Sequence, residues 1–167
     1  MDASLIDTLV AAWPLLWQGL QMTVYVTVVS LVVAMPLGIV TCLMNLSKFR
    51  VLRGIAKFYI WIIRGTPMLV QGFYLYFAVP QLMQATIAPD FRLDIITASI
   101  LTLILNAGAY SAEIFRGAIQ SVPKGQTEAG QVLGMTKTQI FFKVTLLQVV
   151  KRILAPMGNE VITLVKD

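Results

Sequence analysis

The side chains best suited to bind a small charged molecule are Arg64 and Glu160, each of which lies in an otherwise apolar part of the chain. At 1.5 Å per residue from Lys57 and Arg152, the two charges would lie roughly 10 and 12 Å inside an apolar layer about 30 Å thick. A charge at that depth costs about 2.5–3.5 kcal/mol on insertion scales, so it must face a protein cavity and have a partner. A ligand that carries both charges would supply both partners.

Polar groups accompany both charges. Arg64 is followed by Thr66 and Pro67, and a proline inside a helix removes one backbone hydrogen bond and disfavours helical geometry at the preceding residue. We therefore expect the helix to break here and to line a cavity. An anionic group of the ligand would bind Arg64 and the backbone at Thr66 and Pro67, and a cationic group would bind Glu160 with Asn159 beside it. The alternative is a direct Arg64–Glu160 salt bridge that joins two helices.

The elements that position these residues are membrane helices. Hydrophobic residues make up 57% of the chain and charged residues 13%, whereas soluble domains carry about 25% charged residues. The sequence predicts an all-α integral membrane protein with one transmembrane domain over residues 1–167. Long uncharged stretches predict three complete spans and a partial fourth, which is too short to cross a membrane: about 16–44, 58–83, 95–112 and 153–167. We expect the chain to continue beyond Asp167.

Charge distribution predicts the orientation and excludes several functions. Lys48, Arg50, Arg53 and Lys57 lie between the first two spans, and the positive-inside bias places this loop in the cytoplasm and the N-terminus outside. The same bias accounts for the net charge of +5, so nucleic-acid binding is not expected. With no histidine and one cysteine, Cys42, the chain offers no metal site, no disulfide framework and no catalytic residues.

The third span carries polar and small residues. We expect Asn106 to form a hydrogen bond between helices, and Glu113 to pair with Arg116 three residues later. The small residues favour close helix packing, either against a second copy or within one subunit: Ala107, Gly108, Ala109, Ser111 and Ala112.

The segment at about 117–150 is polar and punctuated by Pro123 and several glycines. Ser121 could cap the first turn of a helix, Gly134 could end one, and Thr136 with Gln139 has the spacing of a capping box. We expect two short helices that lie on the cytoplasmic face, the first of them from Lys124 to Leu133.

This segment resembles the EAA loop of ABC-transporter permeases. Glu128, Ala129 and Gly134 fall on its E-A-A-x-x-x-G frame, and Gly130 replaces the second alanine. Further blocks resemble the polar amino acid branch of bacterial ABC importer permeases, and with them the likeness extends from about residue 18 to the end of the chain: 64–67, 106–117, 120–126 and 156–167. Leu147, where that pattern has proline, is a second departure.

The resemblance implies a type I ABC importer permease-like helical bundle, with a fifth span missing from the given chain. It implies a permease subunit that translocates a polar amino acid across the cytoplasmic membrane of a bacterium. Its partners would be an extracytoplasmic amino-acid-binding protein, a second permease copy or paralogue, membrane lipid and a cytoplasmic ATP-binding subunit that holds ATP and Mg. The coupling residues would be Lys124, Gly125, Glu128, Ala129, Gly130 and Gly134. The alternative is a non-transporting membrane adaptor whose loop recruits a soluble partner.

Overall fold

The structure is a computed structural model that describes residues 3–166, all of them in helices and short connections without a strand. The three longest helices are α1 (Ala3–Leu46), α5 (Ile95–Gln120) and α8 (Leu146–Lys166). The remaining elements are shorter: α2 (Arg50–Gly65), α3 (Met68–Phe73), the π-helical η1 (Tyr74–Ala78), α4 (Val79–Thr86), α6 (Lys124–Val132), α7 (Lys137–Ile140) and the π-helical η2 (Phe141–Thr145). The expected all-α architecture is confirmed.

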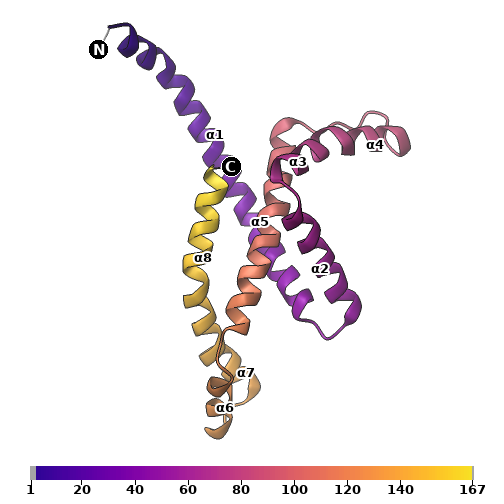
Figure 1. Ribbon diagram of the computed structural model, residues 1–167, viewed down its shortest axis with the longest axis vertical. Helices are drawn as coiled ribbons and strands as arrows, with labels where there is room; N and C mark the ends of the chain where they lie inside the picture. Colours follow the sequence, from indigo (N-terminus) through magenta and orange to yellow (C-terminus); the bar gives the residue numbers. More distant parts are fainter. Residues whose placement is uncertain (1–2, 167) are drawn as a thin grey trace.

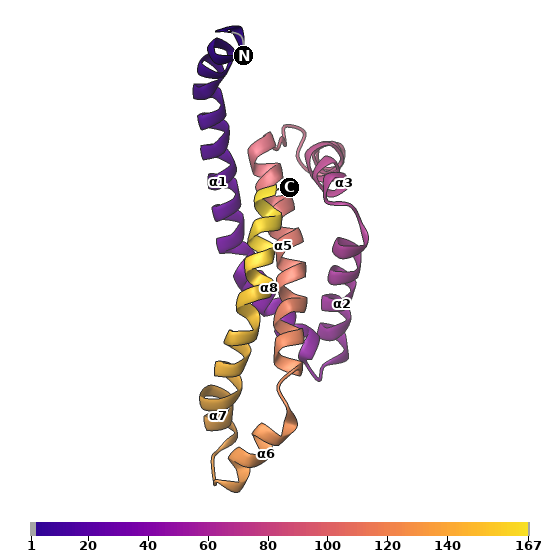
Figure 2. The ribbon, with the colours of Figure 1, turned by 60° about the vertical axis from the view of Figure 1, so that its left-hand side comes forward.

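Helix α5 is the centre of the bundle and packs against α1, α2 and α8 (Figure 2). Its small residues permit this: Ala107, Ala109, Ser111 and Ala112 are fully buried within the chain. A Cβ added to Gly108 would lie 2.8 Å from Leu37 Cδ2, so α1 and α5 approach too closely for a larger residue. The sequence left open whether these small residues pack against a second copy or within one subunit. In the described chain they pack within it.

The break in the second apolar segment is confirmed at Thr66, which has extended backbone angles (φ −122°, ψ 143°) between α2 and α3. Pro67 is the N-cap of α3, with extended backbone angles (φ −61°, ψ 136°), and its ring cannot continue α2. The Gln71 Nε2 atom donates to the carbonyl oxygens of Ile63 at 2.7 Å and Thr66 at 3.0 Å, which satisfies groups that the break leaves open. Helices α3 and α4 then turn away from the axis of α2 (Figure 1).

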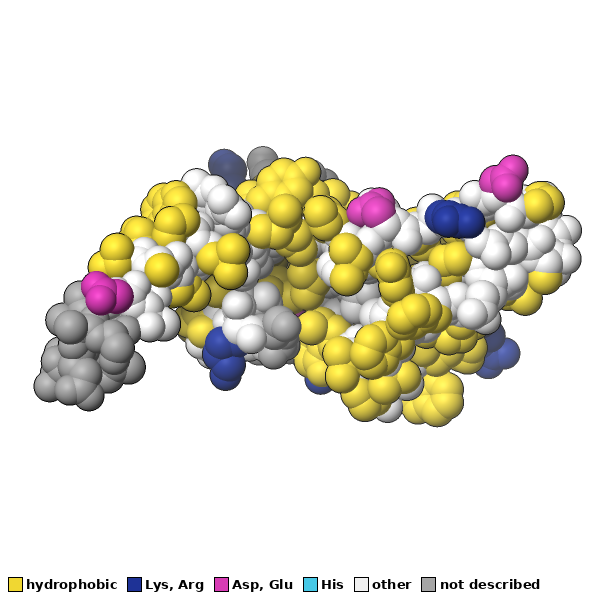
Figure 3. Space-filling view, turned by 90° about the horizontal axis from the view of Figure 1, so that it is seen from above, with side chains coloured by type: hydrophobic (Ala, Val, Ile, Leu, Met, Phe, Trp, Pro, Cys, Tyr) yellow, Lys and Arg dark blue, Asp and Glu magenta, His cyan; other side chains and the backbone are white. Residues whose placement is uncertain are grey.

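The surface is rich in apolar side chains (Figure 3), including Leu15, Trp61 and Leu69, which are 70–75% exposed. Two helical stretches of the described chain are long and apolar enough to cross a membrane, Asp7–Leu46 and Ile95–Gln120. The second expected span, about 58–83, is divided by the break into shorter helices. The third expected span is extended, since α5 continues to Gln120 and carries Glu113 and Arg116 inside the helix.

The segment after α5 forms the two expected short helices, α6 and α7, at the same end of the molecule as the basic connection between α1 and α2 (Figure 1). Gly134, at φ +72°, ends the first, and Thr136 with Gln139 forms the expected capping box. The expected cap at Ser121 is wrong. Its hydroxyl donates back to the Ala118 carbonyl at 2.8 Å, and the residue that precedes the first turn of α6 is Pro123.

Candidate functional site

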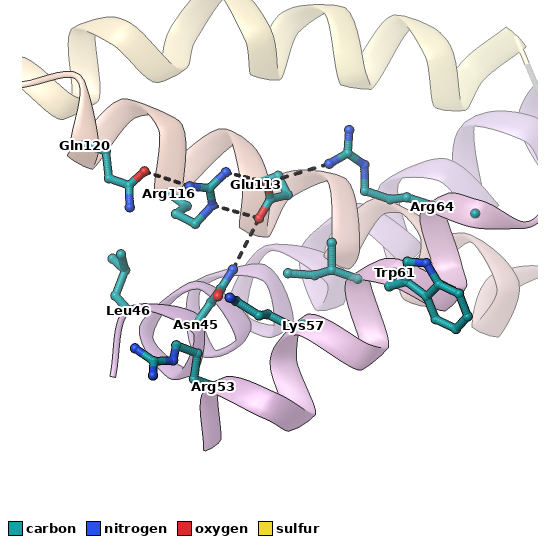
Figure 4. Close-up of a pocket in the computed structure, with 11 residues that line it drawn as sticks. Asn45, Leu46, Arg53, Lys57, Trp61, Arg64, Glu113, Arg116 and Gln120 are labelled. Carbon is teal, nitrogen blue, oxygen red and sulfur yellow. Dashed lines mark hydrogen bonds and ion pairs between the residues drawn. The ribbon is translucent and has the colours of Figure 1, made fainter. Parts of the chain in front are cut away.

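A cavity of about 810 Å³ lies between α1, α2 and α5. Helix α2 contributes Arg53, Lys57 and Arg64, which recur on one side of that helix, and α5 contributes Glu113 and Arg116 (Figure 4). Four cationic side chains and one carboxylate therefore face the same space. The remaining lining residues are Asn45, Leu46, Ile60, Trp61, Gly65 and Gln120.

Glu113 is the hub of this cavity because it contacts side chains from all three helices (Figure 4). Arg116 donates to both of its oxygens, from Nε to Oε1 at 2.9 Å and from Nη2 to Oε2 at 2.7 Å. Asn45 Nδ2 on α1 donates to Oε1 at 3.3 Å. Arg64 Nη1 on α2 lies 3.7 Å from Oε2. The expected Glu113–Arg116 pair is confirmed, and the contact with Arg64 adds to it.

Arg64 occupies the last turn of α2, where the partial negative charge of the helix C-terminus favours a cation. Its guanidinium carbon lies 4.9 Å from the centre of the Tyr110 ring, within the range of a cation–π contact. The side chain is 42% exposed. Arg64 is therefore held on one side by Glu113 and Tyr110 and is open to the cavity on the other.

The other residues of the expected binding site are distributed over two places. Thr66 lies at the break, where its hydroxyl accepts from Gln71 Nε2 at 2.8 Å. Pro67 lines a second, larger cavity of about 930 Å³ between α1, α3, α5 and α8. Asn159 and Glu160 lie on α8 and are not among the residues that line either cavity. The five residues do not surround one cavity in this conformation, and the ion pair that Arg64 makes is with Glu113 rather than the alternative considered from the sequence.

The expected hydrogen bond of Asn106 is confirmed. Its Nδ2 atom donates to Gln71 Oε1 across a distance of 3.5 Å. Since Gln71 also bonds to Ile63 and Thr66, the contact connects the middle of α5 to the break after α2. Asn106 thus supports the backbone beside Arg64.

Sequence reasoning missed Glu113 as part of the cavity. The nearby Arg116 gave it a local partner, and nothing in the spacing indicated that Arg64, on another helix, would reach the same carboxylate. The signal that could have found it is its position, because Glu113 is the first charged residue after a long uncharged stretch. A carboxylate near the end of the apolar stretch of a membrane helix is expected to meet charges from neighbouring helices.

The helix expected to bind the ATP-binding subunit, α6, is presented on the outside of the molecule. Lys124, Gly125, Glu128 and Ala129 are exposed, and the large apolar side chains of Val132 and Leu133 are 86% and 79% exposed at the end of the helix. Apolar exposure on a polar segment marks an interaction site. The expected contact of α6 with an ATP-binding subunit remains a prediction.

Gly130 faces the opposite side and is buried against α7. A Cβ built on it would lie 2.8 Å from Ile140 Cγ1 and 3.2 Å from Ile140 Cδ1. The glycine that replaces alanine in the E-A-A-x-x-x-G frame therefore makes room for Ile140. The departure from the pattern is a matter of packing between α6 and α7.

Both ends of the short-helix segment are tied together. Arg152 Nη1 on α8 donates to the Ser121 carbonyl oxygen and, at 2.6 Å, to the Ser121 hydroxyl at the end of α5. Gln148 Nε2 donates to Gln126 Oε1 on α6 at 3.1 Å. Helices α5, α6 and α8 therefore meet at one junction.

A bundle of apolar helices with a broken second segment, a charged cavity and an exposed short-helix segment is the architecture of a membrane permease. Residues 31–167 match the model of the family described as "Binding-protein-dependent transport system inner membrane component". The chain belongs to this family.

Among its relatives, the L-cystine transport system permease protein TcyB of Bacillus subtilis (strain 168) is 39% identical over 155 residues, which are 93% of this chain and 63% of the relative. The glutamine transport system permease protein GlnP of Escherichia coli (strain K12) is 36% identical, over 93% of this chain and 69% of that protein. The arginine transport system permease protein ArtQ of Bacillus subtilis (strain 168) is 38% identical, over 92% and 68%. The chain thus spans just under two thirds of the first relative's length.

A solved structure described as an amino acid ABC transporter with histidines superimposes with a TM-score of 0.85 at 35% identity, over 95% of this chain and 71% of that one. The MetNI methionine ABC transporter superimposes with a TM-score of 0.61 at 21% identity, over 99% and 74%. The second likeness supports the type I permease fold alone.

Proposed function

We propose that the chain is the membrane-spanning permease subunit of an ATP-driven importer that moves a polar amino acid across the cytoplasmic membrane. The observation that carries this proposal is the position of Arg64, at the break after α2, beside Tyr110 and open to a cavity. A guanidinium in that position suits the carboxylate that every amino acid carries. The names of the relatives, which concern cystine, glutamine and arginine, agree with a ligand of this class.

In this proposal Arg64 and the backbone at Thr66 and Pro67 bind the substrate carboxylate. Glu160 and Asn159 bind the ammonium group, which requires α8 to approach α2 when substrate is present. Broken helices at membrane depth serve this purpose because their ends offer backbone groups to a ligand. The two cavities that Arg64 and Pro67 line would then be successive parts of one passage.

Energy would come from a separate cytoplasmic subunit that binds ATP and Mg, since we assign no catalytic residue to this chain. Its contact would be α6, through Lys124, Gly125, Glu128 and Ala129, with Gly130 and Gly134 shaping the helix. An extracytoplasmic amino-acid-binding protein and a second permease copy or paralogue would complete the importer, with the N-terminus of this chain outside.

The test is uptake of radiolabelled L-glutamine, L-arginine and L-cystine by the complete importer in proteoliposomes. Arg64→Gln removes a charged hydrogen-bond donor, a loss of roughly 1.5–3 kcal/mol, so affinity for the transported amino acid should fall roughly 10- to 150-fold. Glu160→Gln should abolish uptake while the complex assembles and retains basal ATPase activity.

The matched control is Arg92→Gln, the same substitution at an exposed arginine between α4 and α5, which should transport normally. Normal uptake by both Arg64→Gln and Glu160→Gln would contradict the assignment of the binding site. No uptake of any amino acid by the unaltered complex, with the loop still binding a soluble partner, would indicate the adaptor instead.

A further inference from the structure

Arg64 already holds a carboxylate in this structure, and that carboxylate belongs to the protein. Glu113 Oε2 lies 3.7 Å from Arg64 Nη1 on the cavity side of α5 (Figure 4). An incoming carboxylate would meet the same guanidinium. A substrate that binds Arg64 through its carboxylate would therefore compete with Glu113.

The contacts of Glu113 make this competition possible at small cost. Its bonds to Arg116 are short, at 2.7 and 2.9 Å, and Asn45 donates a third hydrogen bond at 3.3 Å. The contact with Arg64 is the longest of the four. If Arg64 moved to another anion, Glu113 would keep three hydrogen bonds and a cationic partner, so no buried charge would be left without compensation.

The charge of the cavity also favours a second anion. Arg53, Lys57, Arg64 and Arg116 line it together with the single carboxylate of Glu113. With four positive charges and one negative charge, the lining has an excess of three. A further carboxylate would reduce that excess, whereas a ligand without an anionic group would add nothing to balance it.

We propose that Glu113 is a resident counter-ion for Arg64, which the carboxylate of the substrate displaces on binding. Arg116 and Asn45 are positioning residues that hold Glu113 when Arg64 leaves it. This inference rests on the proposed function and adds to it a residue that sets the selectivity for a carboxylate. Binding is an exchange of one carboxylate for another on Arg64, and its affinity depends on how firmly Glu113 competes.

The experiment measures equilibrium binding to the complete importer in lipid nanodiscs, with the amino acid that it transports and with the decarboxylated amine of that amino acid. Glu113→Gln removes the competitor, so the Kd of the amino acid should fall about fivefold, equivalent to about 1 kcal/mol for a partly exposed ion pair. The Kd of the amine should not fall, because the amine has no carboxylate to exchange.

The Arg116→Gln substitution should change the Kd of the amino acid in the opposite direction. Without Arg116, Glu113 keeps Arg64 as its cationic partner, so the Kd of the amino acid should rise. In an Arg64→Gln background the Glu113→Gln substitution should have no effect, because the group for which the two carboxylates compete is absent. The matched control is Asp90→Asn, at an exposed carboxylate in the turn after α4, which should leave both Kd values unchanged.

Weaker binding in both Glu113→Gln and Arg116→Gln, or an equal change for the amino acid and the amine, would overturn the proposal and assign the network a structural role. Failure of the proposed function is a separate result. If the proposed function is wrong, the Arg64→Gln variant would transport normally, whatever the effect of Glu113→Gln on the Kd.

Discussion

Gly130→Ala tests the packing of α6 against α7. The added Cβ would lie 2.8 Å from Ile140 Cγ1, which is closer than nonbonded carbon atoms approach, so α6 or Ile140 must shift. Overpacking of this kind costs about 1–3 kcal/mol, and the better helix propensity of alanine returns about 1 kcal/mol. We expect the α6–α7 contact to lose roughly 0–2 kcal/mol, the difference of these two effects.

The assay is hydrogen exchange of residues 124–140 in the complete importer. A loss of about 1 kcal/mol raises the local opening equilibrium about fivefold, and about 2 kcal/mol raises it about 30-fold. Ile140→Ala should remove the clash, so Gly130→Ala should be better tolerated in that background than in the native one. A cost of Gly130→Ala that is the same in the native and the Ile140→Ala backgrounds would refute the argument that Ile140 requires glycine.

Three further predictions concern other parts of the chain. Glu128→Lys on the exposed face of α6 should leave assembly intact but make ATPase activity unresponsive to substrate; normal coupling in this variant would contradict the docking role. Gly38→Ala should destabilise the α1–α5 contact by up to about 2 kcal/mol, because the new Cβ would lie 2.7 Å from Ser111 Cβ at an overpacking cost of about 1–3 kcal/mol, of which the better helix propensity of alanine returns about 1 kcal/mol; thermal unfolding of the purified chain should show it. Hydrogen bonds from the Thr97 side chain and backbone lower the pKa of Asp94 from 3.8. The ionised Asp94 cap therefore stabilises α5 at neutral pH, and this stabilisation is lost as the pH falls through the lowered pKa. Hydrogen exchange at the start of α5, corrected for its intrinsic pH dependence, should rise in acid for the native chain and not for Asp94→Asn.

Local features of the fold could be predicted from the sequence because their causes lie within a few residues. Pro67 dictates the break, Gly134 takes a positive φ, and Thr136 with Gln139 completes a cap by spacing alone. Ser121 was placed wrongly for a local reason too. Helix α5 continues as far as Gln120 and Ser121 is its C-cap, so the Ser121 hydroxyl turns back to Ala118 instead of starting α6.

Features that depend on distant residues could not be predicted in this way. Arg64 and Glu113 come from different helices, and the local partner of Glu113, Arg116, gave no reason to expect a second partner on another helix. The reason for Gly130 became evident once Ile140 was seen against it. The expected approach of Glu160 to Arg64 remains a prediction, because it concerns a substrate-bound arrangement.

The bonds from Arg152 to Ser121 have a mechanical consequence. They fasten the two ends of the α6–α7 segment at a single point, and Gln148 fastens α6 itself near that point. A force applied to α6 would therefore be transmitted to α5 and α8 at this junction rather than absorbed by bending of the segment. Arg152, whose hydrogen bonds form this junction, lies on α8 and outside the exposed face of α6 that we propose as the contact with the ATP-binding subunit.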